Sequence, residues 1–422
     1  MGEREPTGKG KGMELVAFYQ RLLHPAGPWR VTRAELAAAG DRVDVWLEHA
    51  PGVNLACPEC GRACPVYDHT GEREWQHLDT CEAVTVVHAR LPRVNCGAHG
   101  VVQVAAPWAA GSSHFTVGLE RRGITTLLEC SLEGAARLTG LSWDELAGML
   151  TRAVERGLAR RAPGLPARVG IDEKAVFKRH KYCTLITDLD GGRVVEVLEG
   201  RKLKDLEGWF AAQGEPLAKV RDVALDMSAG YAKLMTRFAP QAALSFDHFH
   251  VTQLVGHAVD EVRKAEQAQI TDPERHQWFF RARFLPLYNA ENVPEKRQAQ
   301  FAELKQVAVK TARAWALKEN FRELWHCQTA EAAEAFFRKW YWWATHSRLA
   351  PMCKAAHTLK RHWQGIVNAI THRVTNACTE GLNSKIEKVK RDAYGFRNKA
   401  RLRLAILFHC GGLDLYPHPA PG

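Results

Sequence analysis

The stretch RVGIDEKAVFKRHKYCTLITDLDGGRVVEVL, residues 168–198, decides the predicted fold. Its β-branched and aromatic residues favour strands, and turn residues separate them. We expect a first strand over residues 168–176. A hairpin should follow, with strands over 182–189 and 194–198 joined by Asp190-Gly191-Gly192, because paired glycines adopt the backbone angles of tight turns. Three successive strands therefore begin an α/β sheet.

The chain after this stretch alternates helix and strand before it becomes wholly helical. Apolar residues at helical spacing over 203–210 predict a helix, and residues 223–225 and 242–246 are typical of buried strands. Residues 252–365 have a helical pattern rich in tryptophan, which we interpret as helix-packing core rather than a base-stacking surface. Two basic helices are expected near the carboxyl terminus. This order predicts a ribonuclease-H-like α/β catalytic core interrupted by an all-helical insertion.

Changes in composition divide the chain into five predicted parts. The start is rich in Cys, His, Gly and Pro, and the connector Ala162-Pro163-Gly164-Leu165-Pro166 is typical of a domain boundary. The parts are a zinc-binding β module (1–110), a helix-turn-helix (111–162), the first part of the core (167–255), the helical insertion (256–365) and the closing core helices (366–412).

Two short motifs near the amino terminus predict a metal site. Two pairs of residues, each with two residues between its members, could grip opposite sides of a tetrahedral Zn²⁺. The pairs are Cys57 with Cys60 and Cys96 with His99. Four soft or borderline ligands leave no open position, so the ion would be structural. Free, partly buried cysteines are the alternative. Further candidate ligands are Cys64 and Cys81.

A helix-turn-helix is predicted just before the connector. Residues 131–138 and 142–154 have helical patterns, with Thr139-Gly140-Leu141 as the turn, and Ser142 with Glu145 has capping-box spacing. Such a second helix can enter a DNA major groove, although many helical hairpins bind nothing and Trp143-Asp144-Glu145 is acidic where bases would be read. The side chains expected to pack the two helices together are Ala135, Leu138, Leu146 and Leu150.

Three acidic residues are placed where divalent metals could be held. Asp172 lies on the first predicted strand, Asp226 closes the strand over 223–225, and Glu380 begins a carboxyl-terminal helix. In a ribonuclease-H-like sheet these two strands are neighbours, so the two aspartates would project into one place. Two Mg²⁺ (or Mn²⁺) ions about 3.5–4 Å apart, held by carboxylates, activate the attacking oxygen and stabilise the leaving oxygen in phosphodiester displacement.

Each acid also has a purely structural interpretation. Asp172 could be a surface charge at a strand end, Asp226 could cap the following helix, and Glu380 could be stabilised by the helix dipole. The catalytic interpretation depends on all three occurring in order on the expected elements. Weaker substitutes are Asp188, Asp190, Asp222 and Asp247.

The charge balance favours a polyanionic partner. The 422 residues include 58 Lys and Arg against 47 Asp and Glu, which gives a net charge of +11 at pH 7, and each neutralised phosphate releases a counterion. A solvated basic surface is the alternative. No apolar run approaches the roughly 18 residues of a membrane span, and the polar amino terminus lacks the apolar core of a secretory signal. We therefore expect a cytoplasmic protein with no membrane partner.

Short motifs with these residue types occur in order along the chain. They are Gly170-Ile171-Asp172-Glu173-Lys174, His180-Lys181-Tyr182, Asp188-Leu189-Asp190, Asp226-Met227-Ser228, Phe246-Asp247-His248-Phe249-His250, Thr379-Glu380-Gly381-Leu382-Asn383-Ser384-Lys385 and Tyr394-Gly395-Phe396-Arg397-Asn398. Together they resemble transposases of the ISL-three insertion-sequence family. The resemblance extends from about residue 45 to 410, and includes the zinc motifs and the helix-turn-helix.

The resemblance implies a DDE transposase whose acids are Asp172, Asp226 and Glu380. It would nick double-stranded DNA at the terminal inverted repeats of its element and join the freed 3′-hydroxyl to target DNA. It further implies a homodimer or larger assembly with DNA, associated with the nucleoid of a bacterium. The family's zinc module is usually described by cysteines, so His99 is a departure in the fourth position.

Basic residues near the metals are candidates for holding phosphates, although a solvated surface charge is the alternative for each. Two neighbours, Asp247 and His250, could lie beside the metals or be structural. Two other functions stay open: a ribonuclease-H-like nuclease or resolvase that cleaves without joining, and a non-catalytic DNA-binding regulator derived from a transposase. The basic candidates are Lys174, Arg201, Lys202, Lys385, Lys388, Arg391, Arg397 and Lys399.

Overall fold

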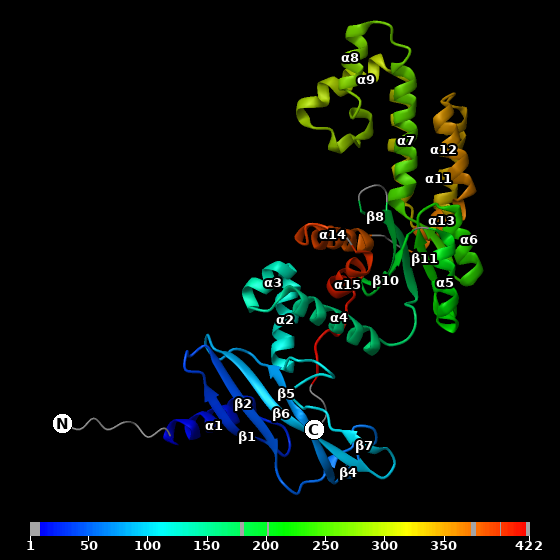
Figure 1. The fold of residues 1–422 in the computed structure, drawn as a ribbon. Coiled ribbons are helices and arrows are strands. Elements are labelled where there is room, and N and C mark those ends of the chain that lie inside the picture. Colours follow the sequence, from blue (N-terminus) through cyan, green and yellow to red (C-terminus); the bar gives the residue numbers. More distant parts are fainter. Residues whose placement is uncertain (1–8, 178–180, 201, 373–376, 397, 419–422) are drawn as a thin grey trace, which may run out of the picture. The chain divides into compact units, whose positions relative to one another are not determined.

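The computed structural model describes residues 9–177, 181–200, 202–372, 377–396 and 398–418. The chain divides into two compact units: unit 1 holds residues 1–161 and 413–422, and unit 2 holds residues 162–412. Figure 1 shows the elements of both units. Within the described ranges, every helix is too short or too polar to cross a bilayer.

The first part of unit 1 contains a mixed β-sheet. Its strands are in the order β1-β2-β6-β5, with β7 on β6; β2 and β6 run parallel and the other neighbours antiparallel. Alternate residues of β2 (Val43, Val45 and Leu47) form one buried cluster with Tyr19 and Trp75, because successive strand side chains point to opposite faces. The elements are α1 (Lys9–Leu23), β1 (Trp29–Leu36), β2 (Arg42–His49), β3 (Leu55–Ala56), β4 (Ala63–Cys64), β5 (Val66–Gln76), β6 (Val84–Cys96) and β7 (Gly100–Gln103).

Three helices follow the sheet in unit 1: α2 (Val117–Glu129), α3 (Leu132–Thr139) and α4 (Trp143–Arg160). The predicted capping box begins α4: Glu145 N–H donates to Ser142 Oγ, and Ser142 N–H donates to the Glu145 carboxylate. Both contacts satisfy N–H groups that a helix start would otherwise leave without partners.

The packing of side chains between α3 and α4 agrees with the prediction except at one position. Ala135, Leu146 and Leu150 are buried as expected, but Leu138 is 75% exposed, so its predicted packing role is wrong. Gly140 ends α3 with a φ of 70° and reverses the chain. The next residue, Leu141, is buried. The turn therefore supplies the apolar contact that the helix was expected to make.

The carboxyl-terminal tail of unit 1 lies along α4. Arg156 donates a 2.6 Å hydrogen bond to the Leu415 carbonyl, and Arg160 forms a 2.9 Å ion pair with Asp414. Leu415 is 4% exposed. A Cβ at Gly157 would stand 2.6 Å from Leu413 Cβ, so only glycine lets the tail approach this closely. The tail is thus a packed part of unit 1.

Unit 2 contains a five-stranded sheet that begins with the three strands predicted from residues 168–198. The order is β10-β9-β8-β11-β12, which puts β8 at the centre. β8, β9 and β10 pair antiparallel as a meander, whereas β8, β11 and β12 pair in parallel. The strands are β8 (Arg168–Phe177), β9 (Lys181–Asp188), β10 (Arg193–Glu199), β11 (Asp222–Leu225) and β12 (Ala243–Phe246).

Helices lie against both faces of this sheet (Figure 1). On one side are α5 (Leu203–Gln213) and α6 (Ala229–Phe238), and on the other are α14 (Ala377–Asp392) and α15 (Lys399–Cys410). Ile171 of β8 belongs to one buried cluster with Phe210 of α5 and Met235 of α6. The next residue, Asp172, bonds to α14. Strand alternation therefore turns Asp172 away from the apolar core and towards α14.

The chain between β12 and α14 is helical, as predicted. Trp340 is buried, and its indole N–H donates 2.8 Å to the Leu317 carbonyl, so this tryptophan packs helices together. Trp342, by contrast, is 64% exposed and does not fit the core interpretation. The longer helices are α7 (His248–Gln267), α8 (Pro273–Arg281), α9 (Gln298–Val307), α10 (Val309–Arg322), α11 (Ala330–His346), α12 (Ala350–Arg361) and α13 (Trp363–Thr371).

Candidate functional site

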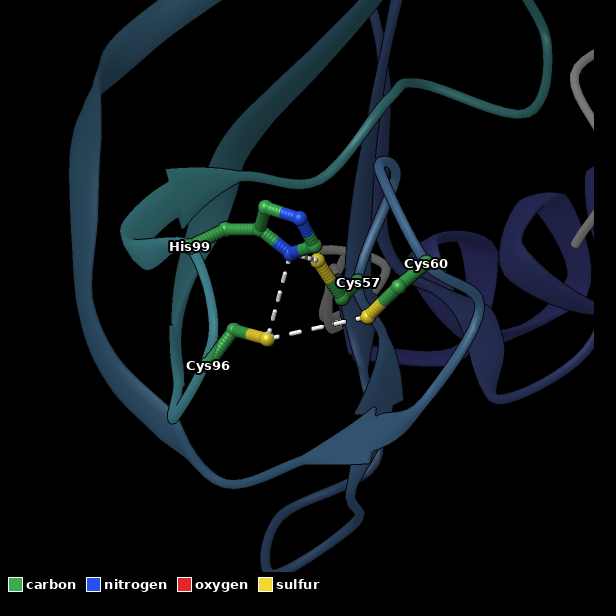
Figure 2. A group of neighbouring side chains, drawn as sticks. All are labelled: Cys57, Cys60, Cys96 and His99. Atoms are coloured by element: carbon green, nitrogen blue, oxygen red, sulfur yellow. Dashed lines mark hydrogen bonds between the residues drawn. The ribbon is translucent and has the colours of Figure 1, made fainter.

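Four potential metal ligands meet in unit 1 (Figure 2). Two lie in the turn between β3 and β4, one ends β6, and one lies in the turn between β6 and β7. Their ligand atoms all lie within 4.8 Å of one another. The four residues are Cys57, Cys60, Cys96 and His99.

The spacing of these atoms fits a tetrahedral zinc ion. Cys60 Sγ and Cys96 Sγ are 3.7 Å apart. His99 Nδ1 is 3.6 Å from Cys96 Sγ and 3.8 Å from Cys57 Sγ. Tetrahedral bonds of about 2.3 Å to sulfur and about 2.0–2.1 Å to nitrogen would separate two sulfurs by about 3.8 Å, and sulfur from nitrogen by about 3.6 Å. His99 therefore fits the fourth position that cysteine usually takes.

Backbone geometry prepares these ligands. The N–H groups of Ala98 and His99, followed by the His99 ring, lower the pKa of the Cys96 thiol to about 6. The thiolate is the form that binds metal. Gly61 and Gly100 have φ values of 73° and 69°. The tight turns require these backbone angles, which residues other than glycine rarely adopt.

The two further candidate cysteines lie outside this group of four. Cys64 is buried in the small apolar cluster beside Cys57 and Cys96, and its thiol donates to the Arg62 carbonyl at 3.4 Å. Cys81 is exposed. The site therefore has a closed Cys₃His donor set, which suits a structural ion rather than a catalytic one.

Asp172 lies on β8, and Asp226 directly follows the neighbouring strand β11. β8 and β11 pair in parallel, with Gly170 opposite Ala224. Asp172 comes two residues after Gly170, and Asp226 comes two residues after Ala224. Because successive side chains of an extended chain alternate between the two faces of a sheet, both aspartates are expected on the same face. Ser228 N–H donates 2.8 Å to Asp226 Oδ1, but Ser228 is the N-cap of α6, so Asp226 does not itself cap that helix.

Helix α14 runs beside β8 with contacts at regular intervals. Four residues of a helix span about 6.0 Å and two residues of a strand span about 6.6 Å. Every fourth residue of α14 can therefore contact every second residue of β8 over several contacts. A Cβ at Gly170 would be 3.4 Å from Thr379 Oγ1, the Asn383 amide is 2.7 Å from Asp172, and Lys174 Nζ is 3.2 Å from Glu387. The pairs are Gly170 with Thr379, Asp172 with Asn383, and Lys174 with Glu387.

Glu380 follows Thr379 on α14 and is exposed. Burial lowers the pKa of His248, the first residue of α7, and the negative charges of Asp247 and Glu380 oppose this shift. Glu380 therefore lies close enough to the start of α7 to act on its histidine. The His248 ring also lies 4.1 Å from Trp325, between ring centroids.

The three acids, Asp172, Asp226 and Glu380, do not form one compact cluster. Among the described residues, the group of three or more potential ligands with all ligand atoms within 4.8 Å is the Cys₃His set alone. Acids that flank two ions about 3.5–4 Å apart need not touch one another, because each flanking acid binds its own ion. Carboxylate oxygens are also the donors that Mg²⁺ prefers, so the donor chemistry fits such ions.

The basic candidates fall into three groups. Lys174, Lys388 and Lys399 form ion pairs, with Glu387, Asp392 and Glu199 respectively. A further three are exposed on unit 2: Lys202, Lys385 and Arg391. The last two, Arg201 and Arg397, lie outside the described residues.

Two neighbours of the acids have structural contacts. Asp247 is buried and caps α7 by accepting from Phe249 N–H, and His250 Nε2 lies 3.8 Å from its carboxylate. Asn383 and His248, which contact or influence the acids, were not singled out by the sequence reasoning. The spacing of Asn383, three residues after Glu380, is the signal that would have suggested a neighbouring place on the helix.

Known proteins similar to this chain are transposases. Residues 169–406 match the family model for transposases of the DDE, ISL-three type, and residues 54–99 match a model described as the zinc-finger of transposase IS204/IS1001/IS1096/IS1165. The transposase for insertion sequence element IS1557 of Mycobacterium tuberculosis is 29% identical over 409 residues, covering 90% of this chain and 91% of that protein. The transposase for IS1001 of Bordetella parapertussis is 26% identical over 398 residues, covering 92% and 97%.

The solved structure of a Drosophila P element transposase strand transfer complex is similar at a TM-score of 0.38 and 11% identity, covering 70% of this chain and 93% of that one. The transposase model alone matches more than half of the chain, and the match contains Asp172, Asp226 and Glu380. The zinc-finger model ends at His99, the fourth residue of the Cys₃His set. The chain therefore belongs to the family of DDE transposases of the ISL-three insertion sequences.

Proposed function

We propose that this protein binds the terminal inverted repeats of its own insertion sequence, cleaves DNA there with Mg²⁺, and joins the 3′-hydroxyl end to target DNA. The acids are Asp172, Asp226 and Glu380. The observation that carries the proposal is the parallel pairing of β8, which bears Asp172, with β11, which Asp226 directly follows. Helix α14, which bears Glu380, contacts Asp172 through Asn383. A meander of three strands followed by two parallel strands is also the order of a ribonuclease-H-like core.

The joining step leaves the number of phosphodiester bonds unchanged, whereas the cleavage step breaks one bond. In cleavage, water attacks a phosphorus and the bond from phosphorus to the 3′ oxygen breaks, which leaves a 3′-hydroxyl. In joining, that hydroxyl attacks a phosphorus of target DNA, loses its proton, and displaces the target's own 3′ oxygen, which gains a proton. Two divalent ions, when bound, activate the attacking oxygen and stabilise the leaving oxygen. The three acids hold them, and no other co-reactant is needed.

Unit 1 would supply DNA binding. Its zinc site stabilises a small β module, and α3 and α4 form a helical hairpin with a clean capping box. The net charge of +11 favours phosphate contacts. We place the terminal inverted repeats on this unit, and the protein would act on paired ends as a homodimer or larger assembly.

The test uses a labelled duplex taken from the DNA that flanks this gene. Purified protein is incubated with the duplex and Mg²⁺, and nicked and joined products are resolved. We expect both products from the wild-type protein and neither from Glu380→Gln, while end binding stays within a few-fold. The matched control is Glu207→Gln on α5, a partly exposed glutamate on the other side of the sheet, which should retain both products.

Other outcomes would identify the alternatives. Nicks without joining, with paired ends supplied, would make the protein a ribonuclease-H-like nuclease. Specific binding with neither product, in Mg²⁺ and in Mn²⁺, would make it a DNA-binding regulator. Equal loss of end binding in Glu380→Gln would count against a metal-binding role for that residue.

A further inference from the structure

Asn383 is a neighbour of the acids to which the proposed chemistry assigns no role. It lies on α14 one turn after Glu380, and its Nδ2 is 2.7 Å from Asp172 Oδ2. The reverse orientation of the amide would set Oδ1 against Asp172 Oδ2, two acceptors with no proton between them. The contact is therefore an N–H donated to the carboxylate, and donation to a charged acceptor makes it a strong hydrogen bond.

The other atoms of Asn383 are also constrained. Its backbone carbonyl accepts from Lys174 Nζ at 3.2 Å, and the same Nζ is 3.2 Å from Glu387. Lys174 is largely buried, with a side chain 12% exposed. Lys174 thus ties the backbone of α14 at Asn383 to β8, two residues from Asp172. This tie holds the amide where it meets the carboxylate.

One atom of Asn383 is left without a partner. Its Oδ1 is buried, and no described residue hydrogen-bonds to it. A buried acceptor of this kind costs about 1–3 kcal/mol when nothing satisfies it. The amide is therefore held with Nδ2 on Asp172 while its own Oδ1 lacks a described partner, so the contact with the carboxylate sets the orientation of the side chain.

We propose that Asn383 is the positioning residue of the metal site: it orients the Asp172 carboxylate through the hydrogen bond that its Nδ2 donates. The proposal rests on the proposed function, because it presumes a divalent ion at Asp172. Partners that orient metal ligands typically change metal affinity by about 10–100-fold when they are removed. Asn383 acts through Asp172, and does not ligate the ion itself.

The test measures metal binding apart from activity. Full-length protein is titrated with Mn²⁺ alone and the bound ion is followed by electron paramagnetic resonance. We expect Asn383→Leu, which matches the side-chain shape but lacks the amide, to weaken Mn²⁺ binding by about 10-fold or more. The Mg²⁺ concentration for half-maximal nicking should rise in parallel. Asn383→Ala keeps the test open if the leucine variant does not fold, and should shift both values in the same direction.

Asn368→Ala is the matched control. Asn368 on α13 also donates one amide hydrogen bond, at 2.8 Å to the Leu244 carbonyl, but it does not contact the acids. It should lose stability and keep the Mn²⁺ affinity of wild type. An Asn383 variant that folds and binds Mn²⁺ within two-fold of wild type would overturn the inference and leave the proposed function standing. A wild-type protein that neither binds Mn²⁺ nor nicks DNA would overturn both.

Discussion

Thr379, near the start of α14, lies directly over Gly170 in the middle of β8. A Cβ built on Gly170 would be 3.4 Å from Thr379 Oγ1, 2.9 Å from Leu189 Cδ2 and 2.3 Å from Thr187 Oγ1. The distance to Thr187 is shorter than real Cβ contacts allow. Glycine at this position is therefore required by the close approach of Thr187 and Leu189, whereas Thr379 of α14 would be at ordinary contact distance.

Gly170→Ala should destabilise unit 2 and impair nicking. The new methyl group must displace the side chains of Thr187 and Leu189, and overpacking of this kind costs about 1–3 kcal/mol. Because the displaced side chains lie beside β8 two residues before Asp172, the contact between Asn383 and Asp172 should also be disturbed. Urea denaturation measures the first effect and Mg²⁺-dependent nicking the second. The control is Gly208→Ala on α5, where nothing lies within 4 Å of the new Cβ, and this variant should be neutral or slightly stabilised.

Cys57→Ser should abolish zinc binding. A structural zinc ion contributes folding free energy outright, so the zinc content of the purified protein should fall from about one ion per chain to near zero, and unit 1 should unfold at lower temperature. Cys81→Ser changes an exposed cysteine outside the group of four and should retain the ion. Elemental analysis measures both. Unchanged zinc in Cys57→Ser would refute the proposed ligand set.

Glu120→Ala should strongly destabilise unit 1. The Glu120 carboxylate is 1% exposed, and it accepts from Ser113 Oγ at 3.0 Å and from Arg152 and Arg156. Removing one partner of a buried ion pair costs about 3–5 kcal/mol, because Arg156, whose side chain is 15% exposed, stays largely buried without a charge partner. Glu133→Ala, which breaks an exposed pair with Arg137, should cost no more than about 0.5 kcal/mol. Similar losses in the two variants would show that the buried network contributes little.

Leu415→Ala should destabilise unit 1 by about 2–5 kcal/mol, the range for truncating a buried leucine. Leu415 is 4% exposed in the tail that lies along α4. Leu138→Ala is the matched control, because Leu138 is 75% exposed, and such surface changes usually stay within about 0.5 kcal/mol. Chemical denaturation of the full chain compares them. A larger loss at Leu138 than at Leu415 would contradict the observed packing of α3.

Unit 1 should lose stability as the pH falls below about 6.5, the ordinary pKa of histidine. Burial lowers the pKa of His77, whose Nδ1 lies 2.8 Å from Thr116 Oγ1. The unfolded chain takes up the proton first on acidification, which favours unfolding until His77 is protonated in the folded state as well. His77→Gln should therefore show a smaller drop in melting temperature between pH 7 and pH 5. His114→Gln, at an exposed position of the same unit, should keep the wild-type drop.

Local features of the fold could be predicted because their partners lie within a few residues. The capping box of Ser142 and Glu145 and the hairpin at Asp190-Gly191-Gly192 depend on backbone angles and hydrogen bonds inside one turn. The alternation of strand and helix in unit 2 follows from apolar periodicity. The predicted burial of Leu138 was wrong because the burial of a helical side chain depends on what packs against its helix, which the local sequence does not contain. The chain turns at Gly140, and Leu141 is buried instead.

The sequence by itself determined the types of ligand and their order: paired soft ligands for zinc in unit 1, and three acids on successive elements in unit 2. Spacing within a turn limits which atoms can meet, so these motifs could be recognised without a fold. Only the tertiary structure decided that Asn383 meets Asp172, 211 residues away. That contact depends on the packing of α14 against β8 and on the near match between four helical and two strand residues. Each of these is a property of packed elements, and no local run of residues contains it.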